Sequence, residues 1–207
     1  GFKGSWLCRI LLNAGAELTG FSLEPPTQPN LFTLAEVAPH MQNLTGDIRD
    51  LDAFRKAYAQ ARPEVVLHLA AQPIVREGYR DPRTTFETNV MGTVNLLECI
   101  RRGDSARSVV NVTTDKVYQN REWCWGYREN EPLDGFDPYS NSKSCSELVT
   151  HSYRASFFGG TDAPAISTAR AGNVIGGGDF APDRIVPDCV RAVSIGKPIV
   201  VRNPYSV

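Results

Sequence analysis

Tyr139 and Lys143 are the two residues whose types and spacing suggest chemistry most directly. They stand four positions apart in the stretch "DPYSNSKSCSE" at 137–147, and residues at this spacing share one face of a helix. A tyrosine with its ordinary pKa of about 10 is no base at neutral pH. A neighbouring ammonium stabilises the phenolate and lowers that pKa. The pair therefore predicts a tyrosine activated as a base, with the lysine as its electrostatic partner.

A second set of polar residues ends an apolar run. The stretch "RSVVNVTT" at 107–114 is typical of a buried strand, and Thr114 and Asp115 stand at its end, directly before Lys116. In open α/β sheets, ligands bind beside the carboxyl ends of the strands, so these side chains are predicted to line a site. The spacing YxxxK alone often arises by chance, but after a Thr-Thr-Asp strand end it is much more specific.

The first residues look like the end of a glycine-rich loop that binds phosphate. Gly1 and Gly4 have the spacing of the last two glycines of a GxxGxxG loop. Gly4 would let a pyrophosphate approach a helix N-terminus, where free backbone N–H groups bind anions. Two glycines are weak evidence, because glycine pairs at such transitions often serve packing alone.

Three other positions fit a nucleotide, each with an ordinary alternative. Ser22 stands where dinucleotide-binding folds carry an acid for the adenosine ribose; the serine predicts modest affinity, and the lack of an arginine there favours NAD over NADP. Asp47 could accept a hydrogen bond from an adenine amino group, or it could cap a turn. Ala70 and Ala71 would let a flat ligand lie against a strand end, or they could fit a close helix–sheet contact.

The elements that must position these residues alternate along the chain. Apolar runs predict strands at 17–23, 42–48, 64–71, 107–114 and 164–176, and helical periodicity predicts helices at 4–16, 51–61, 84–102 and 137–158. Repeated βα units of this length predict an α/β fold with a doubly wound parallel sheet. We expect a dinucleotide-binding domain at 1–175, with its first strand absent, and the beginning of a smaller substrate-binding subdomain at 176–207. The chain is expected to be truncated at both ends.

Composition and charge exclude several classes of protein. A chain of 207 residues with net charge −1 and an isoelectric point near 6.4 has no basic field for nucleic acid or for an anionic membrane surface. No apolar run approaches the roughly 20 residues that span a bilayer. The five cysteines form no CxxC pair and the three histidines have no ligand spacing, so we predict no metal site. We expect reduced thiols and a cytoplasmic protein.

Several motifs together resemble those of a known family. "GDI", "HLAAQ", "TNVMGTVNLLE", "VTTDKVY", "YSNSK" and "RAGNVIGGGD" follow one another along the chain in the order seen in the extended short-chain dehydrogenases/reductases, the nucleotide-sugar epimerases and dehydratases. The likeness covers nearly the whole chain and implies a Rossmann fold. Longer stretches such as "TTDKVYQNREWCWGYRENEPLDGFDPYSNSKSCSEL" are similar to the branch of dehydratases that acts on CDP-glucose.

The resemblance implies an intramolecular redox dehydration of a nucleotide-sugar with NAD. Tyr139 would take the proton of the C4 hydroxyl as hydride passes to NAD, with Thr114 hydrogen-bonded to the C4 oxygen. Asp115 would protonate the C6 hydroxyl as it leaves, and hydride would return to C6. Lys116 occupies the position that is the C5 base, a glutamate, in dTDP-glucose dehydratases. We hypothesise that Lys116 is the base, although it could instead stabilise an enolate while another group removes the proton.

The resemblance also implies two sets of binding residues. The NAD-binding set comprises Gly1, Phe2, Gly4, Ser22, Asp47, Ile48, Leu69, Ala70, Ala71, Asn89, Tyr139 and Lys143, where Lys143 would also hold the nicotinamide ribose. The substrate-binding set comprises Asn173, Arg184 and Arg202; an arginine fork suits phosphate geometry, but either arginine could equally be a solvated charge.

Several alternatives remain open at this stage. A nucleotide-sugar 4-epimerase would use the same Tyr-Lys pair and NAD but would need no acid such as Asp115. A dehydratase acting on a dTDP- or GDP-sugar has the same catalytic chemistry, because the residues do not determine the nucleobase. A non-catalytic NAD-binding protein on the same fold is the third. The helices at 84–102 and 138–158 could pair across a two-fold axis in a homodimer or homotetramer.

Overall fold

The computed structural model describes residues 1–202 and 204, and these form two compact units. Unit 1 comprises Gly1–Gly20, Glu24–Asn43 and the segment that begins at Asn173; unit 2 comprises Phe21–Leu23 and Leu44–Gly172. The dinucleotide-binding domain expected at 1–175 matches neither unit's bounds and stays a prediction. A separate substrate-binding subdomain at 176–207 stays a prediction, and its residues 203 and 205–207 lie outside the described part.

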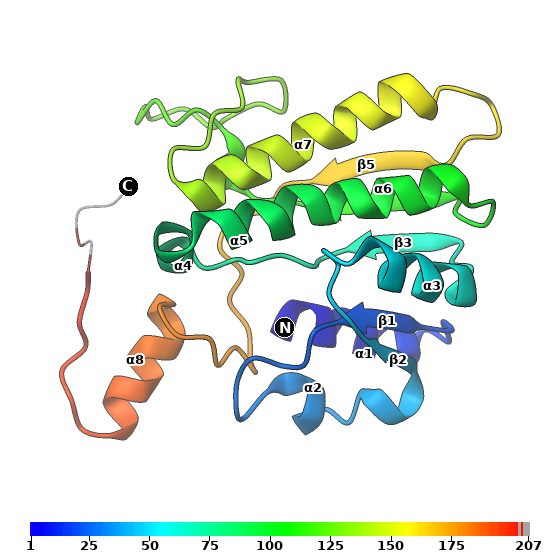
Figure 1. The fold of residues 1–207 in the computed structure, drawn as a ribbon. Helices are drawn as coiled ribbons and strands as arrows, with labels where there is room; N and C mark the ends of the chain where they lie inside the picture. Colours follow the sequence, from blue (N-terminus) through cyan, green and yellow to red (C-terminus); the bar gives the residue numbers. More distant parts are fainter. Residues whose placement is uncertain (203, 205–207) are drawn as a thin grey trace. The chain divides into compact units, whose positions relative to one another are not determined.

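The described strands form two sheets (Figure 1). β1 (Thr19–Ser22) pairs with β2 (Gln42–Thr45), and the second sheet has the order β3 (Val65–His68), β4 (Ser108–Val112), β5 (Ala165–Ala169). Both pairings of the second sheet are parallel, with Leu67 opposite Val110 and Val110 opposite Ser167. The predicted α/β class with a parallel sheet is thereby confirmed, although the strands are shorter than their apolar runs.

Helices connect these strands. The described helices are α1 (Phe2–Asn13), α2 (Leu31–Leu34), α3 (Leu51–Ala61), α4 (Val75–Arg80), α5 (Pro82–Phe86), α6 (Gly92–Arg102), α7 (Pro138–Phe157) and α8 (Ile185–Ser194). Short 3₁₀ turns occupy Ala38–His40 and Asp115–Val117, and a π-helical turn at Glu87–Met91 joins α5 to α6. The predicted helix at 84–102 is thus α5, the π turn and α6 in succession. Sequence periodicity missed α2 and α4, which are too short to show it, and α8.

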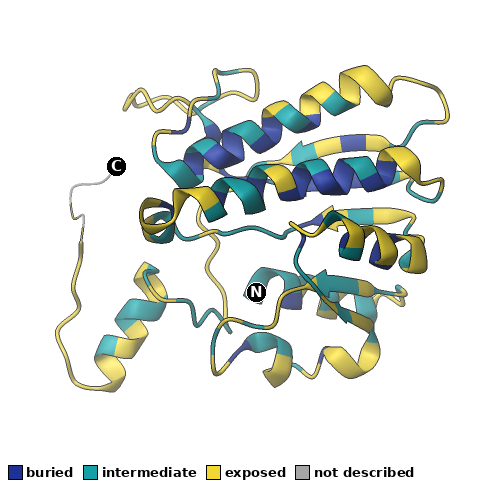
Figure 2. Ribbon diagram, viewed as in Figure 1, coloured by how far each residue is buried: buried dark blue, intermediate teal, exposed yellow. Residues whose placement is uncertain are grey.

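The core of unit 2 lies where α3, α6 and α7 pack on the sheet. Its buried apolar side chains come mainly from α3, α6, β4 and β5, and include Phe54, Leu96, Leu97, Val109 and Ile166. Figure 2 shows the buried residues concentrated along α6 and the first half of α7. On α7 these residues are mostly polar, so this helix packs through hydrogen bonds as much as through apolar contact. No described helix is long and apolar enough to cross a membrane.

Candidate active site

The helix that carries Tyr139 and Lys143 begins where the sequence places it. The Asp137 side chain accepts hydrogen bonds from the backbone N–H groups of Tyr139 and Ser140 at 3.0 and 3.1 Å, which is an N-cap. Pro138 occupies the first helical position, where its missing N–H has no cost. Gly78 of α4 is buried against this turn, and a Cβ there would lie 3.2 Å from the Tyr139 nitrogen. The start of α7 is therefore fixed both by its cap and by packing.

Lys143 follows Tyr139 by one turn on the same face and is buried, whereas Tyr139 is half-buried. The Lys143 ammonium donates to the Val112 carbonyl oxygen at 2.9 Å. This hydrogen bond joins α7 to the last residue of β4, so the helix with the predicted Tyr-Lys pair lies against the strand that leads to Thr114 and Asp115.

The end of β4 turns at once into a 3₁₀ helix. Thr114 caps this helix through a weak hydrogen bond from the Lys116 N–H at 3.4 Å, and its hydroxyl donates to the Asp115 carboxylate at 2.9 Å. The Asp115 N–H donates to the Ala171 carbonyl at 3.0 Å. Thr114 is buried while the Asp115 and Lys116 side chains are exposed. A buried threonine, an exposed carboxylate and an exposed ammonium therefore follow one another directly after the end of β4.

Gly1 forms the N-cap of α1, followed by Phe2 at the first helical position. A Cβ at Gly1 or at Gly4 would meet no described atom within 4 Å. Packing among the described residues thus does not explain these glycines, whereas a close backbone approach by a ligand would. Within unit 1, Phe2 lies beside Arg184, whose guanidinium carbon is 5.9 Å from the ring centre.

Asp47 and Ser22 already have local partners. The Asp47 carboxylate accepts the Arg49 backbone N–H at 2.9 Å and forms a salt bridge with the Arg49 guanidinium at 2.6 Å. The Arg49 hydrogen bond holds the pKa of Asp47 below its usual range. The turn alternative for Asp47 is therefore realised here, and its contact with adenine stays a prediction. The Ser22 hydroxyl donates to the Leu23 carbonyl at 3.0 Å.

The remaining predicted NAD-binding residues lie after β2, after β3 and in the π turn that precedes α6. Ile48 is buried in the core of unit 2, and Leu69, Ala70 and Ala71 are half-buried in the loop that follows β3. Asn89 is buried in the π turn. Its amide accepts from the Gln72 N–H at 2.9 Å and donates to the Gln72 carbonyl at 3.1 Å and to the Ser142 hydroxyl at 2.8 Å. In this structure Asn89 therefore fixes the loop after β3.

The three predicted substrate-binding residues lie in unit 1. Asn173 is exposed just beyond the last residue of unit 2. Arg184 pairs with Asp179 at 3.4 Å, and Arg202 pairs with Asp183 at 2.8 Å and with Asp188 at 3.1 Å. Either arginine would have to exchange or share its carboxylate in order to hold a diphosphate.

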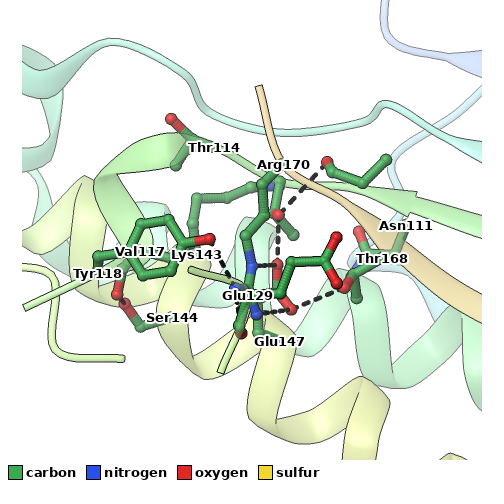
Figure 3. Close-up of polar contacts among 12 residues, drawn as sticks. Asn111, Thr114, Val117, Tyr118, Glu129, Lys143, Ser144, Glu147, Thr168 and Arg170 are labelled. Carbon is green, nitrogen blue, oxygen red and sulfur yellow. Dashed lines mark hydrogen bonds and ion pairs between the residues drawn. The ribbon is translucent and has the colours of Figure 1, made fainter. Parts of the chain in front are cut away.

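Sequence reasoning missed a buried ion pair that adjoins this site. Figure 3 shows Arg170, which follows β5, lying between Glu147 of α7 and Tyr118. Its guanidinium pairs with the Glu147 carboxylate at 2.9 Å, and Glu147 is 4% exposed. A signal was available, because Glu147 follows Tyr139 and Lys143 at helical spacing and so must share their buried face.

His68 is a second buried group that the sequence did not single out. Its Nε2 lies 3.3 Å from the Thr93 hydroxyl. Burial, helped by the positive charge of Lys143, lowers the pKa of His68 to about 3. The imidazole is therefore neutral at physiological pH and adds no positive charge beside Lys143.

Comparison with known proteins places the chain in a family. A sequence profile of the family described as GDP-mannose 4,6 dehydratase matches residues 1–197. The chain belongs to this family. The match confirms the resemblance to the extended short-chain dehydrogenases/reductases that act on nucleotide-sugars.

Curated relatives include two kinds of 4,6-dehydratase. The CDP-glucose 4,6-dehydratase of Salmonella typhimurium is 49% identical over 211 residues, which cover 100% of this chain and 59% of the relative. A dTDP-glucose 4,6-dehydratase of Streptomyces griseus is 32% identical over 201 residues, covering 95% of this chain and 58% of the relative. The chain thus spans somewhat less than two thirds of the length of these relatives.

Solved structures confirm the fold. DesIV, a dTDP-glucose 4,6-dehydratase from Streptomyces venezuelae with NAD and TYD bound, matches with a TM-score of 0.81 at 26% identity over 95% of this chain and 60% of that chain. The UDP-glucose 4-epimerase of Thermus thermophilus in complex with NAD also gives 0.81, at 26% identity over 96% of this chain and 61% of that chain. Both epimerases and dehydratases therefore share the fold.

Proposed function

We propose that the protein is an NAD-dependent CDP-glucose 4,6-dehydratase, which forms CDP-4-keto-6-deoxyglucose. The observation that carries the proposal is the hydrogen bond of 2.9 Å from Lys143 to the Val112 carbonyl. It sets the helix with Tyr139 and Lys143 against the strand end with Thr114 and Asp115, which is the set of groups that this reaction requires. The 49% identity with the Salmonella enzyme supports CDP-glucose as the substrate.

The first half of the reaction needs a base at the C4 hydroxyl. Tyr139 takes the proton from this hydroxyl, and the Lys143 ammonium one turn away stabilises the phenolate. Thr114 is buried and held by the 3₁₀ turn that it caps, so its hydroxyl can orient the C4 oxygen. Bound NAD would supply the hydride acceptor for C4 and, once water has left, the hydride donor for C6.

The second half removes water from C5 and C6. The exposed Asp115 carboxyl donates a proton to the C6 hydroxyl as it leaves, and the proton on C5 is taken by a base. We propose Lys116 as that base, because it is the next residue in the same 3₁₀ turn. Its side chain is exposed in this structure, so the bound substrate must exclude water from the amine for it to lose its own proton and accept the one on C5. The C4 ketone acidifies the C5 hydrogen, so a base of moderate strength suffices.

The predicted NAD-binding residues offer features that suit a dinucleotide. Gly1 and Gly4 leave open space at the start of α1, whose N–H groups suit a pyrophosphate. Ala70 and Ala71 would present a small surface to the nicotinamide end. Ser22, Asp47, Ile48, Leu69 and Asn89 complete the proposed NAD-binding set, in which Asn89 acts by holding the Gln72 backbone. For the substrate, Asn173 and Arg202 would contact the diphosphate and Arg184 the nucleotide.

We propose that two copies associate through the helix pair formed by α6 and α7, as a dimer or within a tetramer. Leu148 and Phe157 of α7, and Met91 of the π turn directly before α6, are large apolar side chains exposed on these elements. Light scattering that finds only monomer would exclude the association.

We also propose a cytoplasmic location, which fits the five free cysteines.

The deciding experiment is product analysis of the complete gene product. It is incubated with NAD and, separately, with CDP-glucose, dTDP-glucose, UDP-glucose and GDP-mannose, and each product is weighed by mass spectrometry. We expect the loss of one water from CDP-glucose alone. Loss of water from a different nucleotide-sugar would show that the substrate carries that nucleotide instead. No change in any of the four sugars would favour a non-catalytic NAD-binding protein.

An epimerase is the alternative that the fold allows, since a 4-epimerase has the same TM-score of 0.81. Asp115→Asn discriminates between the two, because only a dehydratase needs this acid. We expect Asp115→Asn to slow dehydration by about 10²- to 10⁴-fold, while Asp134→Asn, an exposed aspartate outside the proposed site, keeps the wild-type rate. An unchanged mass with an inverted C4 by NMR would establish an epimerase.

Lys116→Ala tests the C5 base separately. Exchange of the C5 hydrogen with solvent deuterium should be lost if Lys116 removes it. Exchange at the wild-type rate would exclude that role and leave the base to another group.

A further inference from the structure

Glu147 is a buried carboxylate on the catalytic face of α7, one turn beyond Lys143. One oxygen accepts from the Thr113 hydroxyl at 2.5 Å and from Arg170 Nε at 2.9 Å. The other accepts from the Thr168 hydroxyl at 2.8 Å and from Arg170 Nη2 at 3.1 Å. The carboxylate therefore joins α7 to the ends of both β4 and β5, and the arginine holds it in the two-pronged geometry that fixes orientation most firmly.

Arg170 extends the connection to the loop after the 3₁₀ turn. Its Nη1 donates to the Tyr118 hydroxyl at 3.0 Å and to the Glu129 carbonyl at 2.8 Å. The Tyr118 ring in turn stacks on Tyr127 with ring centres 5.1 Å apart. Figure 3 shows Arg170 as the hub that the helix, the strand ends and this loop share.

Both members of the pair are charged. Burial raises the pKa of the Glu147 carboxyl, but hydrogen bonds from Arg170, Thr113 and Thr168 outweigh it, and the pKa lies below its usual value. The hydrogen bond to Glu147 raises the pKa of Arg170. A buried ion pair stabilises a fold little compared with a well-packed apolar pair, because both charges must leave water. Stabilisation of the fold is therefore a weak explanation for this ion pair. The fixed geometry that it imposes on α7 and the two strand ends is a stronger one.

We propose that Glu147 and Arg170 are positioning residues that hold the segment carrying Thr114 and Asp115 in register with Tyr139. Thr113, which Glu147 binds, is the direct neighbour of Thr114, and the Thr113 N–H donates to the Ala169 carbonyl at 2.8 Å just before Arg170. This inference rests on the proposed function. It assigns the pair mainly to the elimination half of the reaction, because both proposed groups of that half, Asp115 and Lys116, lie on the held segment. Of the groups proposed for the oxidation half, only Thr114 lies there, since Tyr139 and Lys143 belong to the helix.

The test is a double variant, Glu147→Leu with Arg170→Met, which replaces the pair by apolar side chains and so removes the tie without leaving a buried charge. We expect KM for CDP-glucose to stay near its wild-type value and kcat to fall by about 10- to 100-fold, as for a displacement of about 1 Å. Because oxidation at C4 suffers less than elimination, bound NADH and the 4-keto-glucose nucleotide should accumulate in a single turnover. A merely structural role would not change this partition, that is, the ratio of accumulated 4-keto-glucose nucleotide to dehydrated product.

The control is the double variant Glu98→Leu with Arg101→Met. Glu98 and Arg101 form a second Glu-Arg pair on α6, and Glu98 also accepts from Tyr153 of α7, away from the strand ends. It should leave kcat and the partition unchanged. Arg170→Lys is the second test variant, in case the apolar pair fails to fold. It keeps the charge beside Glu147 but loses the fork that reaches Glu147 and Tyr118 together, so NADH should again accumulate. A wild-type partition in a folded test variant overturns the proposal.

A readout independent of activity separates this proposal from the proposed function. The amides of Thr113 and Asp115 donate to the Ala169 and Ala171 carbonyls, and their hydrogen exchange reports whether the segment is held. We expect exchange at both amides to accelerate in the Glu147/Arg170 variant and not in the control. If the wild-type protein dehydrates no nucleotide-sugar, the proposed function fails while this measurement still decides the positioning. Unchanged exchange overturns the proposal.

Discussion

Two networks built from the same groups each include one residue of α7, Glu147 in the first and Tyr153 in the second. In the inner network, Glu147 pairs with Arg170 at 2.9 Å, with side-chain exposures of 4% and 18%. In the outer network, Glu98 of α6 pairs with Arg101 at 2.8 Å, with exposures of 20% and 34%. Each includes a tyrosine hydroxyl: Tyr118 accepts from Arg170, and Tyr153 donates to Glu98 at 3.0 Å. The two networks contain the same chemical groups, but the inner one is less exposed to water than the outer one.

The difference lies in what each network joins. Glu98 and Arg101 belong to one turn of one helix, so their contact is local and water can replace much of it. Glu147 and Arg170 are separated by 23 positions and join a helix to two strand ends, where the Glu147 carboxylate is almost wholly removed from water. Burial makes the inner pair costly to break and also makes it rigid. An ion pair therefore acts as a positioning device only where solvent is excluded and the partners belong to different elements.

Breaking the inner pair on one side should give the largest effect. Arg170→Met leaves the Glu147 carboxylate buried without its counter-charge, and we expect the free energy of unfolding to fall by about 3–5 kcal/mol. Urea unfolding followed by circular dichroism measures the loss. The double change of Glu147→Leu and Arg170→Met should recover most of it. A loss below about 1 kcal/mol, as for surface pairs, would mean that water reaches Glu147 and that the two networks do not differ.

Gly135 tests how closely the preceding loop packs on the buried face of α7. It donates its N–H to the Ser144 hydroxyl at 3.0 Å, and a Cβ there would overlap the Ser140 carbonyl and lie 2.7 Å from the Asn141 nitrogen. Gly135→Ala must shift the loop or the first turn of α7, so we expect a loss of about 1–3 kcal/mol in unfolding free energy. Gly126→Ala is the control, because a Cβ at Gly126 meets no described atom within 4 Å. Equal losses at the two glycines would contradict the close packing at Gly135.

The buried imidazole of His68 makes the free energy of unfolding depend on pH. Its pKa is lowered from 6.5 to about 3 in the folded protein, first by burial. Below pH 6.5 the unfolded chain takes up a proton that the folded chain refuses, so stability must fall as pH decreases. Between about pH 6.5 and 5 the loss attributable to His68 should be roughly 1.5–2 kcal/mol. His68→Gln should flatten the pH dependence of urea unfolding in this window, and an unchanged slope would show that His68 is not the titrating group.

The outer network should give the smallest effect. Glu98→Gln removes the charge that Arg101 and Arg102 share, and we expect less than about 1 kcal/mol of lost stability. Because this contact is partly open to water, the loss should shrink further in high salt. The loss from Arg170→Met should change little with salt. Thermal unfolding at low and high ionic strength measures both, and an equal salt dependence would remove the distinction between inner and outer.

The local features of the fold were accessible from the sequence. The pattern over 137–158 predicted a helix, and the structure confirms it as α7 (Pro138–Phe157), which Asp137 caps. Asp50 likewise caps α3 through the N–H groups of Asp52 and Ala53. Such features depend on neighbouring residues only, so propensity and spacing suffice to predict them. The roles of the predicted site residues stay predictions.

Distant partners were not accessible in the same way. Nothing in the spacing of Asn89 indicates that its amide holds the Gln72 backbone, and nothing beside Arg170 in the sequence indicates a partner 23 positions earlier. The α4 helix was missed because six residues show too little periodicity, and its place depends on Gly78 meeting α7.

The sequence by itself determined the α/β class, the order of the five strands with α1, α3, α6 and α7, and the residues that carry the family resemblance. Hydrophobic periodicity and short-range capping are local properties, and they are written directly in the order of the residues. Only the tertiary structure decided which polar groups lose their water and which partners replace it. That choice separates Glu147 from Glu98, because the dielectric surroundings of a charge depend on everything that packs around it.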